Sequence, residues 1–107
     1  MKDSFTYEDI IMTIIAQSGE ARTYSMEAIK KAKTNVFDIA EEYLKKANDC
    51  FLEAHKVQTQ MIQDEINNKK HEVTLLMVHA QDHLMNAMTV RELAEEIISL
   101  HKRLQKD

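Results

Sequence analysis

The sequence predicts an all-α protein, an antiparallel up-down-up bundle of three long helices that assembles as a homo-oligomer. Glycine occurs once and proline not at all in the 107 residues, so the chain lacks the turn residues that hairpins and short strands need. Its apolar residues recur instead at steps of three and four, the spacing of one face of a helix. A chain of this length has room for one core, and we expect a single domain over residues 1–107.

The charge balance excludes a typical nucleic-acid-binding protein. There are 18 acidic and 14 basic residues, a net charge of -4, and no basic stripe. Charges interrupt every apolar run well before the ~20 residues of a membrane helix, and no apolar signal core follows residues 1–5. The one cysteine, Cys50, cannot form a disulfide within the chain and fits a reducing compartment. We therefore expect a cytoplasmic protein that inserts into no membrane.

The first predicted helix starts after a short lead-in of residues 1–5. Thr6 with Asp9 three positions later resembles a capping box, a signal for a helix N-terminus. One face of this helix is apolar in its first half and lined by small residues in its second half. It consists of Ile11, Ile14, Ile15, Ser18, Ala21, Ser25, Ala28 and Ala32. Gly19 costs this helix roughly 1 kcal/mol relative to alanine. Either a close contact to its backbone offsets that cost, or the helix tolerates it.

The second predicted helix follows a break at Thr34–Asn35, with Asn35 as its expected N-cap. It ends at a short loop, residues 67–70. Its stripe turns polar near His55, which we interpret as a surface histidine rather than a functional one. The stripe consists of Phe37, Ala40, Leu44, Ala47, Phe51, Ala54, Gln58 and Met61.

The third predicted helix runs from about His71 to Leu104. Its expected core face is Leu76, Ala80, His83, Ala87, Val90, Ala94, Ile97, His101 and Leu104. A second apolar face is formed by Val73, Met77, Leu84 and Met88, and Val78 and Met85 occupy a third side. A helix in a three-helix monomer should keep one face polar. We therefore expect other copies of the chain to cover the third helix.

The segment 78–85 places two histidines, a carboxylate and an amide inside this apolar helix. At about 100° per residue, Asp82 lies roughly 60° to one side of His79 and His83 roughly 40° to the other. These three residues share one broad face. Gln81 points roughly 160° away from His79, so within one chain it cannot easily serve that imidazole, whereas in an oligomer it could reach a histidine of a neighbouring subunit.

Three interpretations of the histidines compete. His79 and His83 have the i, i+4 spacing of metal ligands, but no third ligand is evident. Alternatively, both could be structural histidines whose ring nitrogens find partners within the core. This interpretation is favoured for His83, because it falls on the expected core face. The third interpretation makes His79 a nucleophile, since a neutral imidazole can accept a phosphoryl group and pass it on.

Asp82 needs an explanation of its own, because a carboxylate on a self-associating face is costly unless it is paired. Around a symmetry axis, copies of Asp82 would meet. Their repulsion would be relieved by protonation or by a hard divalent cation with oxygen ligands.

Three segments carry a resemblance to a known family. The segment Val78-His79-Ala80-Gln81-Asp82-His83-Leu84-Met85 resembles the active-site signature of the lactose/cellobiose-type enzyme IIA of the bacterial sugar phosphotransferase system. Segments 18–22 and 53–59 are similar to the family as well, and the resemblance extends over residues 8 to 104. It implies a trimer in which His79 is phosphorylated by HPr and passes the group to a cysteine of enzyme IIB. It also implies that Asp82 binds one divalent ion per trimer, magnesium, and that Gln81 lies near the phosphorylated histidine.

The sequence departs from the family's usual pattern at two places. The family usually has Gly-Asp where Asn35-Val36 precede Phe37 here, which alters a turn outside the site. Ala80 is more similar to the cellobiose/chitobiose branch than to the lactose branch, where glycine is common.

The sequence thus predicts a phosphocarrier for uptake of a β-linked disaccharide, working with the membrane enzyme IIC. The competing prediction is a helical scaffold or adaptor with structural histidines. The transported sugar is not encoded in this chain, and His55 and His83 are left without an assigned role in the site.

Overall fold

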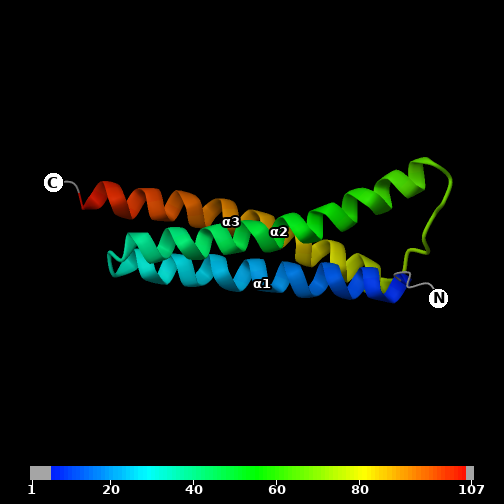
Figure 1. Cartoon of the computed structure of the whole chain (residues 1–107), viewed down its shortest axis with the longest axis horizontal. Coiled ribbons are helices and arrows are strands. Elements are labelled where there is room, and N and C mark those ends of the chain that lie inside the picture. The colour runs from blue at the N-terminus through cyan, green and yellow to red at the C-terminus, as the bar shows by residue number, and fades with distance from the viewer. Residues whose placement is uncertain (1–5, 106–107) are drawn as a thin grey trace.

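The computed structural model describes residues 6–105, and all the secondary structure in that range is helical. Helix α1 covers Tyr7–Lys33, α2 covers Phe37–Ile66 and α3 covers Leu75–Leu104. They run up, down and up along a molecule of 58 × 26 × 21 Å (Figure 1). The predicted three-helix bundle is confirmed. None of the helices described is long and apolar enough to span a membrane, and the expected lead-in, residues 1–5, lies outside the described range.

Side-chain caps fix two of the three helix starts. The amide of Asp9 donates to Thr6 Oγ1 at 3.0 Å and the amide of Thr6 donates to Asp9 Oδ2 at 3.1 Å, which confirms the capping box. Thr74 Oγ1 accepts from the amide of Met77 at 3.1 Å, so α3 starts at Leu75 rather than near His71. The loop before α3 therefore spans residues 67–74, longer than expected.

The predicted cap at Asn35 is wrong. Val36 takes the N-cap position of α2 and makes no side-chain capping bond. Asn35 instead has φ 64°, the left-handed conformation that asparagine tolerates better than most residues. Its role is to turn the chain between α1 and α2.

Small side chains allow the helices to pack closely. Nine alanines have no exposed surface, and every helix contributes three of them: Ala21, Ala28, Ala32, Ala40, Ala47, Ala54, Ala80, Ala87 and Ala94. The predicted face of α1 is buried apart from Ile15, which is half-buried. Gly19 is a different case, because a Cβ added there would meet nothing within 4 Å. Within one chain, α1 simply tolerates this glycine.

The predicted core face of α3 is partly wrong. The buried residues are Met77, Ala80, Leu84, Ala87, Ala94 and Ile98. At several turns the core residue lies one position after the predicted one, so that Met77 replaces Leu76 and Ile98 replaces Ile97. Periodicity could not fix this phase, because leucine, methionine and isoleucine occupy several sides of the helix.

The face of α3 opposite the core is apolar and exposed. We call it the outer stripe, and it consists of Leu75, Val78, Met85, Leu93, Leu100 and Leu104. Their exposed fractions range from 46% for Met85 to 86% for Leu75. On a helix of about 100° per residue they lie within about 60° of Asp82, whereas Ala80 and Leu84 lie about 160° away. The expectation that α3 is apolar on more than one side is confirmed.

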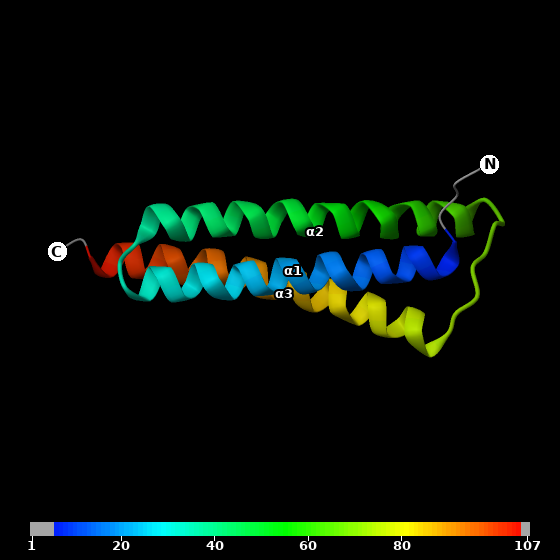
Figure 2. The ribbon, with the colours of Figure 1, turned by 60° about the horizontal axis from the view of Figure 1, so that its bottom comes forward.

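The end of α2 and the start of α3 diverge, and the loop 67–74 spans the gap between them (Figure 2). The loop is fastened to the start of α1. The ring of Tyr7 stacks on the ring of His71 with centroids 5.5 Å apart and an interplanar angle of 12°. The hydroxyl of Tyr7 also donates to the carbonyl oxygen of Glu72.

The same loop is fastened to the end of α2 through Asp64. One carboxylate oxygen accepts from Gln60 Nε2 at 3.0 Å, and the other lies 3.2 Å from His71 Nε2. These hydrogen bonds, with that of Gln60 the larger effect, hold the pKa of Asp64 below its usual value. Asp64 is thus kept charged beside the loop.

Candidate functional site

The two histidines of segment 78–85 contact each other directly. Their Nε2 atoms are 3.0 Å apart and their rings meet edge to face, with centroids 4.4 Å apart. His79 is exposed and His83 is half-buried. The prediction that they share a face is confirmed, but the assignment of His83 to the core is wrong, because the core passes through Leu84 instead.

The position of this pair follows from the two apolar faces of α3. At about 100° per residue, His79 lies about 60° from Asp82 on the outer stripe and about 100° from Ala80 on the core face. The imidazoles therefore occupy the boundary between the packed core and the exposed stripe. A group there can be held on one side by its own chain and approached by another molecule from the other.

Gln81 faces α2 instead of His79, as its position on the helix predicts. Gln58 Nε2 donates to Gln81 Oε1 at 2.7 Å, and Gln81 Nε2 lies 3.3 Å from the sulfur of Met77. Gln58 was predicted only as a polar member of the α2 stripe. A sequence cannot reveal that it partners Gln81, since the pairing depends on how α2 and α3 are placed.

A cavity lies behind this glutamine pair, between the diverging ends of α2 and α3. Its volume is about 210 Å³. Residues 71–73 of the loop line it, and so do Gln58 and Gln81. Other lining residues include Met61, Ile62, His71, Val73, Met77 and Val78. The cavity therefore connects the fastened loop to the segment that carries the histidine pair.

Asp82 is exposed and lies in the middle of the outer stripe. It forms no ion pair with another residue of the range 6–105. In the same range, no three His, Cys, Asp or Glu side chains are grouped so that they could hold a metal ion. A single chain thus offers one carboxylate, that of Asp82, at this place.

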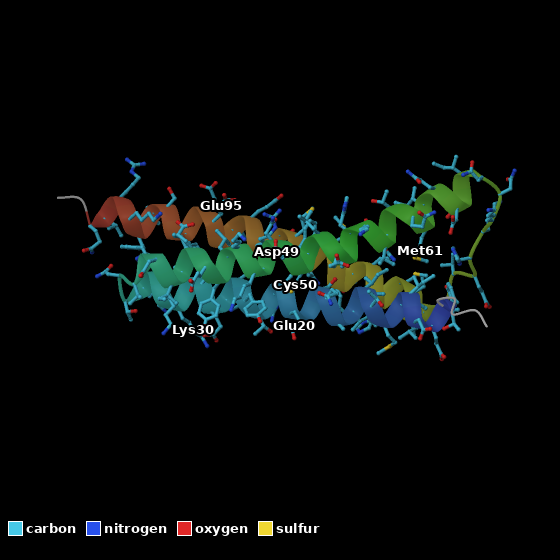
Figure 3. All side chains as sticks on the ribbon, in the orientation of Figure 1. Glu20, Lys30, Asp49, Cys50, Met61 and Glu95 are labelled. Atoms are coloured by element: carbon cyan, nitrogen blue, oxygen red, sulfur yellow. The ribbon has the colours of Figure 1, made fainter. Side chains whose placement is uncertain are left out.

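His55 and Cys50 lie outside this arrangement. His55 is exposed on α2 with its ring 5.5 Å from that of Phe51, as expected for a surface histidine. Burial raises the pKa of the Cys50 thiol, and the carboxylates of Glu20 and Asp49 raise it further (Figure 3). The thiol therefore stays protonated and is a poor nucleophile.

Comparison with known proteins identifies the family. The family described as "PTS system, Lactose/Cellobiose specific IIA subunit" matches residues 9–102. The lichenan-specific phosphotransferase enzyme IIA component of Bacillus subtilis is 48% identical over 97 residues, which are 91% of this chain and 88% of that protein.

Solved structures agree with this match. The cellobiose-specific enzyme IIA from Bacillus anthracis has a TM-score of 0.89 and 45% identity, over 95% of this chain and 94% of that one. The IIA(Chitobiose) chain from a complex with HPr of Escherichia coli has a TM-score of 0.80 and 38% identity, over 97% and 99%. This chain therefore belongs to the lactose/cellobiose-specific IIA subunits of the sugar phosphotransferase system.

Proposed function

We propose that this protein is a cytoplasmic phosphocarrier. It accepts a phosphoryl group from phospho-HPr on His79 and passes it to a cysteine of enzyme IIB, so that the membrane enzyme IIC can take up a sugar. The relatives are named for lichenan, cellobiose and chitobiose. A β-linked disaccharide of the cellobiose/chitobiose type is accordingly the favoured sugar.

One observation carries this proposal: an exposed imidazole on a rigid helix, held by a second imidazole at 3.0 Å. A neutral imidazole has a lone pair that can attack phosphorus, and a neighbouring group decides which ring nitrogen holds that lone pair. In the transfer, the P–N bond to the histidine of HPr breaks and a P–N bond to His79 forms. No cofactor is consumed, and the imidazole of HPr leaves with the electron pair.

Both partners need access to the same imidazole. A relative with a TM-score of 0.80 is known in complex with HPr, which supports HPr as the donor to this chain. Donor and acceptor must therefore dock in turn over the surface around His79. Such alternating contacts favour modest, short-lived interfaces.

The outer stripe supports assembly through α3. Six large aliphatic side chains recur on that face, and each is at least 46% exposed in the single chain. A row of large exposed apolar side chains of this kind is typical of an interaction site. Three copies of α3 packed around an axis would bury the stripe and leave His79 beside the neighbouring chain.

Asp82 is suited to bind a divalent metal ion at the axis of such a trimer. It is the acidic residue in the middle of the stripe, and three copies would bring three carboxylates together. Oxygen donors of this type suit Mg²⁺, which would neutralise their charges and hold the chains together. The ion has no part in the phosphoryl transfer that we propose.

Gln81 is proposed to assist the site of a neighbouring chain. Its Oε1 is occupied by Gln58, and its Nε2 has two hydrogens, of which one is directed to Met77. The second can be donated to a phosphoryl oxygen on His79 of the next protomer.

Incubation with phosphoenolpyruvate, enzyme I and HPr tests the carrier activity. We expect the wild type to gain one acid-labile phosphate per chain, measured as intact mass, and His79→Gln to gain none. His55→Gln is the matched control, since it removes another exposed histidine and should leave the gain intact. A phosphate on His79→Gln would refute the assignment. If the wild type gains no phosphate, although the same enzyme I and HPr phosphorylate a known acceptor, the alternative function as a helical adaptor would be favoured.

Replacing Asp82 tests the metal and the packing together. Asp82→Leu removes the carboxylates from the stripe, so we expect the trimer to survive a chelator that weakens the wild-type trimer. Glu95→Leu changes an exposed carboxylate on another face of α3 and should retain the wild-type dependence on metal. Sedimentation velocity with and without chelator provides the measurement. An Asp82→Leu protein that becomes monomeric would contradict packing through this stripe.

Mixed trimers test whether sites are shared between chains. We expect His79→Gln trimers to be inactive and Gln81→Met trimers to transfer phosphate slowly. Unfolding and refolding the two together should create sites with His79 from one chain and Gln81 from another, and the rate per His79 should rise. An unchanged rate in confirmed mixed trimers would remove Gln81 from the neighbour's site.

A further inference from the structure

One arginine occupies a core position of α3. At about 100° per residue, Arg91 lies about 180° from Asp82, on the same face as the buried residues Ala87 and Ala94. It is half-buried, although arginine is seldom placed on a core face unless it is paired. We propose that Arg91 is the centre of a binding site for a small phosphate ester, in a crevice between α2 and α3. This site goes beyond the proposed carrier function and uses none of its residues.

The guanidinium of Arg91 is only partly satisfied within its own chain. Its Cζ lies 5.0 Å from the centroid of the Phe51 ring, and Phe51 is buried, so an aromatic ring covers one face of the cation. Among residues 6–105, Arg91 forms no ion pair, and its Nε is sealed from solvent without a hydrogen-bond acceptor. The hydrogen-bonding capacity that remains accessible lies in the two terminal amino groups of the guanidinium.

Arg91 lines a crevice of about 290 Å³ between α2 and α3. The remaining lining residues are Glu41, Leu44, Lys45, Asn48 and Glu95. Lys45 and Asn48 are three positions apart and are therefore neighbours on α2. With Arg91 on α3, they bring an ammonium, an amide and a guanidinium to one crevice. A phosphate group takes several such donors at once, because its three free oxygens accept strong hydrogen bonds and share a charge of up to two.

Two carboxylates also line the crevice, and they decide what kind of anion fits. Glu41 is paired with Lys102, so its charge is balanced. Glu95 is exposed on α3 and forms no ion pair with another residue of the range 6–105 (Figure 3). It repels a bare anion but accepts a hydrogen bond from a ligand hydroxyl. The crevice therefore suits a phosphate ester that has hydroxyl groups beside its phosphate, as polyol and sugar phosphates do.

This crevice is separate from the histidine pair. Arg91 follows His79 by twelve residues, which is ~18 Å along α3 at 1.5 Å per residue. Arg91 also lies on the side of α3 opposite the outer stripe, so packing of α3 through that stripe does not use this face. Binding in the crevice is reversible and involves no covalent step. It therefore requires neither the phosphohistidine nor the metal that we propose for the axis.

Titration with glycerol phosphate tests the site, with the affinity measured by calorimetry. Arg91→Met keeps the length of the side chain and removes its charge and donors, so we expect affinity to fall about tenfold or more. Lys46→Met is the matched control, because this neighbouring lysine lies over the ring of Tyr24 instead of lining the crevice. It should bind as the wild type does.

Heteronuclear NMR provides a direct readout at the arginine. Because Nε of Arg91 is sealed from solvent, its N–H signal should be protected from exchange, and it can be assigned by its loss in Arg91→Lys. We expect this signal to shift and saturate as glycerol phosphate is added. Inorganic phosphate should bind about threefold or more weakly, since it lacks the hydroxyl groups that donate to Glu95. Glu95→Leu should remove that difference.

An unmoved Arg91 signal at millimolar glycerol phosphate would overturn the site, and so would equal losses of affinity in Arg91→Met and Lys46→Met. Equal affinity for inorganic phosphate and the ester would overturn the role of Glu95. Uptake of phosphate at His79 by Arg91→Met, at the wild-type level, would show that this variant folds. If it fails to fold, Arg91→Lys decides, because it keeps the charge and loses the two terminal amino groups: undiminished affinity would contradict recognition by the guanidinium.

Discussion

The structure depends on one feature of α3: it packs against its own bundle on one side and has a row of exposed aliphatic side chains on the opposite side. Its inner face has alanines with no exposed surface, which lets α3 approach its neighbours closely. Its outer face has six exposed aliphatic side chains, which water does not solvate well. The boundary between these two faces is the place on the helix where a polar group can be both fixed and accessible, and the histidine pair lies there.

The divergence of α2 and α3 is a second feature that shapes the region around the site. The two helices separate toward the loop 67–74, and the cavity lined by Gln58 and Gln81 lies between their diverging ends. The loop would leave this end open if it were not held by Tyr7 on α1 and Asp64 on α2. Through these contacts, the ends of all three helices are coupled to the region around Gln81, so the fold provides a stable platform for a site that consists of very few side chains.

The sequence was sufficient for the fold class, the α1 face, the capping box at Thr6 and the shared face of His79 and His83. Each depends on local spacing along one helix. Asn35 and the core face of α3 were mispredicted for different reasons. Asparagine serves equally well as a cap and as a left-handed turn residue, and a helix apolar on several sides does not reveal its phase. The Gln58–Gln81 bond was beyond prediction, because it is a contact between two helices.

A carrier differs from an adaptor in that it releases what it has accepted. The most direct measurement starts from phosphorylated protein freed of HPr and enzyme I, mixed with an enzyme IIB of the cellobiose type whose cysteine is intact. Intact masses should show one phosphate lost from this chain and one gained by enzyme IIB, with no gain when the cysteine of enzyme IIB is replaced by serine. Phosphate that stays on this chain, or that appears only as free inorganic phosphate, would contradict a carrier acting through His79.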